Sequence, residues 1–557
     1  MRKTTLSLLL LFALALMLVA CGGSGAEQPS GNTPAQSTPA NPSTTPGTTP
    51  GTAPGTGAGS TPAEATGPEG QKYGGLMRLV VTDPSLPFGL TWEMGNSENT
   101  LLVPYAEPLL IESLYGELSP HLAESWEVDV ENAEIRFKLV EGVMFTDGSE
   151  LTAEEVAWQF MKQIEARSMN TAVIDVEVRG KYEIAAILNA FNNTTLTHFA
   201  GHVTAFVSKE NYDKNGEEFA RNNPVGTGPH ILEERRIGSQ VNFVRNEAYW
   251  IPGRPFLDEI EYVGVTDMMT QNAVFMSTGN DTLHVLRTSI GEQYAVLSEL
   301  PNVDVHKWQS GIATLAPSSL DENSPLSNYD VRLAIYHAID REALCAARGF
   351  GLTAPAYQVI APGFVGYLPE LDSASINAYD PDRAKELLAG AGYPNGFSVT
   401  FYSPQAAFGS TFDQDTAVAI QKMLTDVGIN ASMEFPEAGA ATDLRNNGWD
   451  GLMAHTVGSF TNSSSAFRLN IDPFYQYQPS VWRPVELILP AFEESRATPK
   501  QESALLQKLH RYYVDNMVVV PINFRTQTAL VKSNVHDTGF GVVSGVTIWL
   551  PWDAWMD

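Results

Sequence analysis

The chain has 557 residues, 18% of them charged, and a formal net charge of −30 at pH 7. So much negative charge disfavours nucleic acid as a partner, because the phosphate backbone would be repelled. The chain is also longer than one hydrophobic core usually serves, so we expect two lobes or more.

The N-terminus has the pattern of an export signal. Residues 1–3 (MRK) carry positive charge, and residues 6–20 form an apolar run too short to span a bilayer comfortably. The run ends in LVACG, which resembles a bacterial lipobox. This resemblance implies that residues 1–21 are a lipoprotein signal peptide with its lipobox and that Cys21 is diacylated. An ordinary signal peptide with a chance cysteine is the alternative; two acyl chains would anchor the chain stably to a membrane.

Residues 22–72 consist mainly of Gly, Ser, Thr, Pro and Ala. Such a segment buries too little apolar surface to offset its chain entropy, so we expect a disordered tether with a span of roughly 40 Å. If Cys21 carries lipid, Cys345 is the one cysteine that remains, which leaves no partner for an intrachain disulfide.

Residues 121–156 read as strand, turn and helix. Apolar and charged residues alternate in EIRFKL at 134–139, which predicts a half-buried strand. An Asp-Gly pair then turns the chain, and Thr152 with Glu155 predicts a capping box that starts a helix.

The same stretch, HLAESWE…FKLVEGVMFTDGSELTAEEV, resembles the signature of family 5 extracytoplasmic solute-binding proteins, the receptors of peptide and nickel ABC importers. Four further segments match the pattern of this family: NPVGTGPH at 223–230, VRNEAYWIPGRPFLDEIEYV at 244–263, PLSNYDVRLAIYHAIDRE at 325–342 and YDPDRAKELLAGAGYPNGF at 379–397. A phosphate-binding loop is the alternative at 223–230, but the segment lacks the Gly-Lys-Ser/Thr ending.

The resemblance implies an α/β fold: a two-lobed clam like the type II periplasmic binding proteins, with an extra subdomain in the first lobe. The expected limits are 73–305 for the first lobe, about 100–205 for the inserted subdomain, 306–520 for the second lobe and 521–557 for a C-terminal return to the first lobe. The residues themselves predict an α/β second lobe. A strand over 397–401, a helix ending at Gly428 and a strand over 429–433 have links short enough for a parallel pair.

The function implied is that of a lipid-anchored, extracytoplasmic receptor, expected as a monomer, which captures a small solute between closing lobes and delivers it to ABC transporter permease subunits. An oligopeptide is the leading ligand; an oligosaccharide, another polar organic solute or a metal chelate are alternatives. No cofactor, nucleic acid or enzymatic activity is expected. An exported hydrolase and a signalling or adhesion module are the competing classes, but no G-x-S-x-G or H-E-x-x-H motif points to hydrolysis.

Peptide-binding members have a Trp-led segment whose aspartate pairs with the α-ammonium of the peptide. This chain has Trp449 and Asp450, but the expected aspartate position holds Ser459, followed by Phe460. A neutral serine cannot supply the charge-assisted bond that a buried ammonium needs. Either another carboxylate replaces the aspartate or the ligand is not a free peptide.

Other candidate ligand contacts are aromatic or lie in the same segment. His455 is expected as a structural histidine, with metal or chelate ligation as the alternative, and no metal site is predicted. Trp92 lies near a ligand-contacting loop of the family, while Arg332 and Asp340 are expected as structural ion-pair groups. The full predicted ligand-binding set is Trp92, Tyr105, Trp449, His455, Thr456, Ser459, Phe460 and Trp482.

Overall fold

The structure is a computed structural model. It describes residues 70–81, 84, 88–94, 99–169, 172–191, 193–201, 204–371, 378–404, 414–458, 480–482, 486, 490, 494, 503–544 and 548–557. The predicted signal peptide, Cys21 and nearly all of the predicted tether lie outside these residues, as do Ser459 and Phe460. Within the described part, no helix has the length and apolar character needed to cross a membrane.

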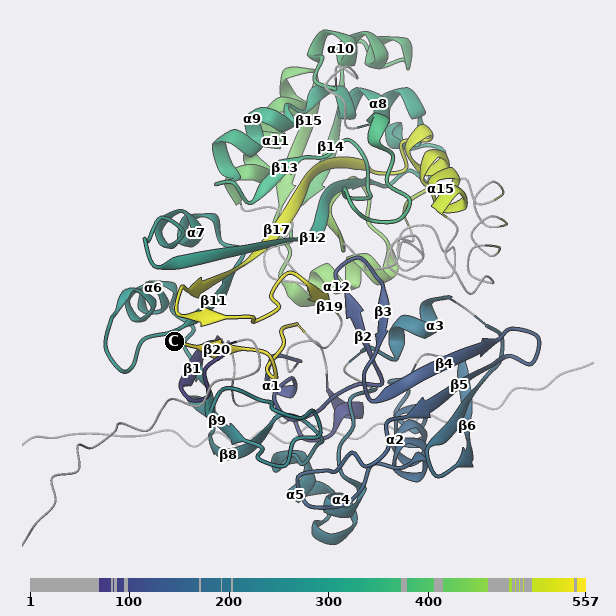
Figure 1. The fold of residues 1–557 in the computed structure, drawn as a ribbon. Helices are drawn as coiled ribbons and strands as arrows, with labels where there is room; N and C mark the ends of the chain where they lie inside the picture. Colours follow the sequence, from purple (N-terminus) through teal and green to yellow (C-terminus); the bar gives the residue numbers. More distant parts are fainter. Residues whose placement is uncertain are drawn as a thin grey trace, which may run out of the picture. The chain divides into compact units, whose positions relative to one another are not determined.

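One sheet of eleven strands runs through the described part of the chain (Figure 1). Its order is β15-β14-β16-β12-β17-β11-β1-β10-β9-β8, and β13 pairs with β17 off this path. The strands are β1 (Leu76–Val81), β8 (His230–Arg236), β9 (Gln240–Arg245), β10 (Glu259–Gly264), β11 (Val285–Thr288), β12 (Val303–Pro317), β13 (Thr353–Pro355), β14 (Phe397–Tyr402), β15 (Ile429–Glu434), β16 (Leu452–Gly458) and β17 (Val520–Lys532).

Strands β12 and β17 join two lobes. They have 15 and 13 residues and pair antiparallel from Val303 with Lys532 to Leu315 with Val520. At one end β17 pairs with β11, and at the other end β12 pairs with β16. The fold is therefore α/β and two-lobed, as expected, whereas the predicted limits of the lobes stay a prediction.

In the first lobe, β1 and β10 are parallel, and β10, β9 and β8 form antiparallel pairs. Helices α6 (Met268–Met276) and α7 (Gly291–Leu297) cover the face that carries Leu286 and Leu530. The opposite face packs against the C-terminal segment, where Trp549 joins a core with Ala529. The remaining short elements are η1 (Thr91–Glu93), α1 (Asn99–Leu102), α4 (Lys209–Asn215), α5 (Glu217–Asn222), β18 (Val535–His536) and β20 (Trp555–Met556).

A separate four-stranded antiparallel sheet has the order β4-β5-β7-β6, with β4 (Ala123–Asp129), β5 (Glu134–Leu139), β6 (Val173–Gly180) and β7 (Glu183–Leu188). Strand β5 and the capping box of Thr152 and Glu155 at the start of α2 (Ala153–Glu165) confirm the sequence predictions. A third sheet lies in this region, in which β2 (Leu110–Ser113) pairs with β3 (Leu118–Pro120) on one side and with β19 (Val543–Ser544) on the other. The helix α3 (Asn193–His198) completes the region.

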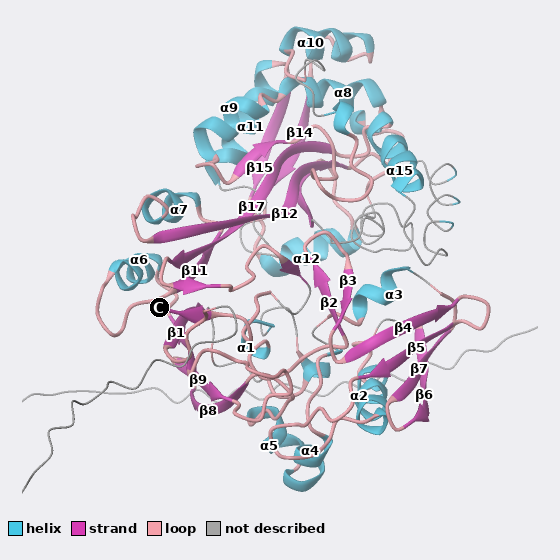
Figure 2. Ribbon diagram, viewed as in Figure 1, coloured by secondary structure: helices cyan, strands magenta, loops and turns pink. Residues whose placement is uncertain are grey.

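The second lobe contains the predicted strand-helix-strand unit, because β14 and β15 are parallel and α11 (Gln414–Asp426) connects them. Figure 2 shows the helices of this lobe around its strands. They are α8 (Tyr329–Ala338), α9 (Arg341–Arg348), α10 (Pro381–Gly390), α12 (Ala438–Asn447) and α15 (Ser503–Asp515), with the short turns η3 (Pro325–Ser327) and η4 (Pro369–Leu371).

Arg332 and Asp340 are structural, as predicted, but the expectation of ion pairs is corrected. Asp340 caps α9 and accepts a hydrogen bond from the Ala343 N–H at 2.9 Å. The Arg332 guanidinium donates to backbone carbonyls, including that of Met517 at 3.0 Å. Among the described residues, neutral carbonyl dipoles rather than a carboxylate therefore hold this buried cation.

Candidate functional site

Strands β12 and β17, which join the two lobes, become less buried at the same place in the sheet. Both are buried toward the second lobe, but the side chains of residues 306–310 on β12 and 525–527 on β17 are only partly buried or exposed. A β-bulge lies here, since the register shifts between Gln309 and Gly311 and leaves Ser310 without an opposite residue. Bulges bend a strand and increase its twist. The floor between the two lobes is thus a partly exposed stretch of sheet that is interrupted by a bulge.

Strand β16 reaches this floor from the second lobe. Gly311 is paired with Gly458 on one side and with Arg525 on the other. Because neighbouring strands are about 4.8 Å apart, the backbones of Gly458 and Arg525 are separated by about 10 Å. The last residue of β16 and a cationic side chain therefore belong to the same part of the sheet.

Arg525 has no counter-charge among the described residues. Its side chain is half-buried, and burial is the cause that lowers its pKa. No ion pair or side-chain hydrogen bond of Arg525 is found in the described part of the chain; its carbonyl accepts a hydrogen bond from Ser310 Oγ at 3.3 Å. Sequence reasoning missed this residue, although a lone arginine within the neutral run PINFRTQTAL was the available signal.

Arg287 on β11 is a second such cation. Its guanidinium carbon lies 5.9 Å from the centroid of the Trp308 ring, and within the described residues no carboxylate pairs with it. Its side chain has substantial solvent exposure, yet burial still lowers its pKa.

His455 and Thr456, from the predicted ligand set, lie on β16 beside β12, opposite Thr314 and Ala313. Burial, and then the charge of Arg445, lowers the pKa of His455 to about 4. His455 is therefore neutral at pH 7. Groups of three or more His, Cys, Asp or Glu side chains that could hold a metal are absent from the described residues.

The two predicted first-lobe contacts, Trp92 and Tyr105, lie in a hydrophobic core. Trp92 is 9% exposed and packs edge-on against Trp158 at 5.6 Å between ring centroids. Tyr105 is 1% exposed, and its hydroxyl donates to the Phe88 carbonyl. In this arrangement both side chains serve packing.

The two predicted tryptophans of the second lobe are also held by the protein. The Trp449 indole donates to the Ala316 carbonyl at 3.2 Å, and the side chain is 6% exposed. The backbone N–H of Trp482 donates to Ser319 Oγ at 2.9 Å, and the centroid of its ring lies 5.7 Å from the Arg332 guanidinium carbon.

Residues of the family signature segments meet at a buried carboxylate rather than at the floor between the lobes. Glu107 is fully buried and accepts four hydrogen bonds. The donors are His121 Nε2 at 2.9 Å, Thr227 Oγ1 at 2.8 Å, the Tyr249 hydroxyl at 2.6 Å and Trp250 Nε1 at 3.0 Å. These donors come from three sequence segments, so the signature marks a structural network that ties the first lobe together.

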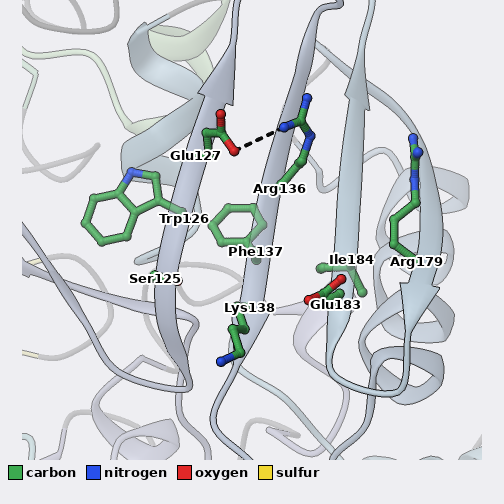
Figure 3. A pocket seen from close by; sticks show the side chains of 9 residues that line it. All are labelled: Ser125, Trp126, Glu127, Arg136, Phe137, Lys138, Arg179, Glu183 and Ile184. Carbon is green, nitrogen blue, oxygen red and sulfur yellow. Dashed lines mark hydrogen bonds and ion pairs between the residues drawn. The ribbon is translucent and has the colours of Figure 1, made fainter.

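Two other hollows lie away from the floor. One, of about 380 Å³, lies beside Asp450 and residues 397–400 of β14. The other, of about 250 Å³, lies on the four-stranded sheet (Figure 3). There Arg136 pairs with Glu127 at 3.0 Å, and Arg179 pairs with Glu134 at 3.1 Å. The arginines of this second hollow are thus already neutralised by the protein.

Comparison with known proteins supports one class. The model for the bacterial extracellular solute-binding proteins, family 5, matches residues 117–475. The glutathione-binding protein GsiB of Escherichia coli strain K12 is 30% identical over 332 residues, which cover 57% of this chain and 61% of GsiB.

Two solved structures share the fold. DppA from Helicobacter pylori, in complex with the peptide STSA, has a TM-score of 0.68 at 20% identity and covers 87% of this chain and 98% of its own. NikA from Brucella suis, in complex with Fe(III)-EDTA, has a TM-score of 0.70 at 19% identity. The match covers 85% of this chain and 98% of the NikA chain.

Fold and sequence together define the class of this protein as the bacterial extracellular solute-binding proteins. The chain belongs to family 5 of the bacterial extracellular solute-binding proteins.

Proposed function

We propose that this chain is a lipid-anchored receptor that captures a small solute between its two lobes and passes it to the permease of an ABC importer. The observation that carries the proposal is the open floor formed by β12 and β17, because these strands join the lobes and bend at the bulge beside Ser310. Closure of two lobes over such a floor excludes water and strengthens polar contacts with a ligand.

The leading ligand is an oligopeptide. GsiB is named for glutathione and DppA holds a tetrapeptide, which supports a peptide or peptide-like solute here. NikA with Fe(III)-EDTA supports a metal chelate as the second candidate. Within the predicted ligand set, we assign contacts to His455 and Thr456 on β16, and to Ser459 and Phe460, which follow β16 in the sequence, rather than to the packed Trp92 and Tyr105.

The experiment is native mass spectrometry of the full-length chain purified gently from its host, followed by a thermal-shift panel of peptides, sugars and chelates. Bound masses spaced by amino-acid residues would support the peptide assignment. Hexose-spaced masses, or stabilisation by chelates alone, would overturn it. A protein that carries no solute and responds to no member of the panel would count against the receptor itself.

Lipid anchoring is tested separately. Cells expressing the chain are labelled with radioactive palmitate, and Cys21→Ala should abolish both the label and recovery in the membrane fraction. Equal labelling of the two proteins would contradict the proposed anchor.

A further inference from the structure

Arg287, Trp308 and Arg525 share one face of the sheet. On β17, Arg525, Gln527 and Ala529 alternate onto the same face. Ala529 is paired with Arg287 of β11, and Gln527 is paired with Trp308 of β12. The bulge lies on β12, so it does not interrupt this alternation along β17. The three strands are neighbours in the sheet (Figure 1).

The environment of these two arginines is unlike that of the arginines in Figure 3. Arg136 and Arg179 lie on the surface of the four-stranded sheet, and each has a carboxylate within 3.1 Å. Arg525 is half-buried and Arg287 is exposed to solvent, and neither has a carboxylate among its described contacts. A cation that has lost part of its hydration and gained no partner costs stability. This cost is offset when an anion binds.

We propose that Arg525 and Arg287, with Trp308 beside them, form a subsite that receives a carboxylate of a small organic acid on the floor between the lobes. The inference rests on the proposed receptor function and narrows its ligand class. A guanidinium presents paired N–H groups that match the two oxygens of a carboxylate. The Trp308 indole offers an apolar surface for the carbon chain of the ligand.

The spacing of the two cations defines the ligand further. Four residues separate Arg525 from Ala529, the partner of Arg287, which corresponds to about 13 Å along the strand. Arg287 and Trp308 lie on the two strands that flank β17, and the Arg287 guanidinium carbon is 5.9 Å from the centroid of the Trp308 ring. A backbone separation of this size suits an extended acid with two carboxylates, one at each cation.

The test measures binding of named probes to the full-length chain by thermal shift and titration calorimetry. The probes are succinate, glutathione, trialanine, trialanine amide and maltose. We expect succinate, glutathione or trialanine to bind, and trialanine to bind at least tenfold more tightly than its amide. Affinity for the acid should fall as salt is raised, because the site remains in contact with solvent.

Variants assign the effect to the subsite. Arg525→Gln and Arg287→Gln should each weaken acid binding at least tenfold, and Arg525→Lys should retain part of it. The matched control is Arg179→Gln, which removes a cation that is already paired and should leave affinity unchanged. The melting temperature of each variant without ligand shows that it is folded.

The outcomes separate this inference from the receptor function. If maltose or trialanine amide binds and the acids do not, or if Arg525→Gln keeps full affinity for the acid, the anion subsite is wrong and the receptor stands. If no probe binds to protein that melts cooperatively, the result counts against the subsite and against the receptor together.

Discussion

The second lobe and the floor between the lobes hold arginines in opposite ways. In the second lobe, Arg332 donates to four backbone carbonyls and Arg341 donates to three, at 2.6–3.1 Å. At the floor, Arg287 and Arg525 make no comparable hydrogen bonds with the described residues. Burial lowers the pKa of all four guanidinium groups. Burial alone therefore does not distinguish a structural cation from a binding one.

What distinguishes them is whether the fold has supplied partners for the N–H groups. A guanidinium whose donors are satisfied by carbonyls stabilises the turns that carry those carbonyls. A guanidinium whose donors are not satisfied by the protein does not stabilise such turns. Its N–H groups can instead bind a ligand. The free energy of unfolding of substituted chains tests this difference, because it shows which charged groups stabilise the fold.

The largest effect is expected at the buried carboxylate. Glu107→Ala should lower the free energy of unfolding by about 4 kcal/mol, because four donors, three of them on buried residues, lose their acceptor. Urea denaturation of the parent chain and the variant measures this loss of free energy of unfolding. The control is Thr227→Val, which removes one donor and should cost about 1 kcal/mol. Equal effects of the two substitutions would contradict a network centred on Glu107.

The second prediction compares the two classes of arginine directly. Arg332→Met should lower the free energy of unfolding by about 3 kcal/mol, because the carbonyls of Leu326, Ser327 and Met517 lose a buried donor. Arg525→Met should leave stability unchanged or raise it slightly, because no protein partner is lost. A loss at Arg525 as large as that at Arg332 would show that Arg525 is a structural residue.

Buried histidines differ from both classes of arginine, because an imidazole can lose its proton and become neutral when it is buried. His510 is fully buried; its Nδ1 faces the Gly366 carbonyl at 2.9 Å and its Nε2 accepts from the Val359 N–H at 3.3 Å. Burial lowers its pKa from 6.5 to about 4. Between these values the unfolded chain binds a proton that the folded chain does not, so stability falls as the pH falls.

This linkage predicts that His510 contributes about 2 kcal/mol to the loss of stability between pH 7 and pH 5. The measurement is urea denaturation of the parent chain and of His510→Gln at both pH values. The variant should start less stable at pH 7, because its buried contacts change, and should lose less on acidification. An unchanged acid-induced loss in the variant would refute the assignment.

The sequence predicts the local elements well because their signals are local. The alternation of residues 134–139, the capping box at Thr152 and the βαβ unit each depend on residues fewer than about 40 positions apart. The cation pair depends instead on β11 meeting β17, strands about 240 residues apart, which no pattern within either strand reveals.

Aromatic residues mislead for a related reason. Trp92 and Tyr105 are hydrophobic, large and near a ligand-contacting segment of the family, and these properties suit a binding site and a core equally. Only the contacts with Trp158 and Phe88 show that the fold uses them for packing. The predicted contacts on β16 stay predictions, since Ser459 and Phe460 lie beyond the described end of that strand.

The smallest change in free energy is expected from reversing the preference of the binding site for the charge of its ligand. Ser459→Asp restores the carboxylate found in peptide-binding members, so affinity for free-amine peptides should rise about tenfold, equivalent to about 1.4 kcal/mol. The same substitution adds a negative charge and should weaken succinate, because like charges repel. Calorimetry with trialanine and with N-acetyl-trialanine separates the two contributions, since only the first has a free ammonium. A gain for both peptides would contradict an ammonium contact, and no gain for either would contradict the alignment of Ser459 with the family aspartate.

A gain for trialanine together with a loss for succinate would place Ser459 and Arg525 in one binding site, where the charge at each position selects the ligand.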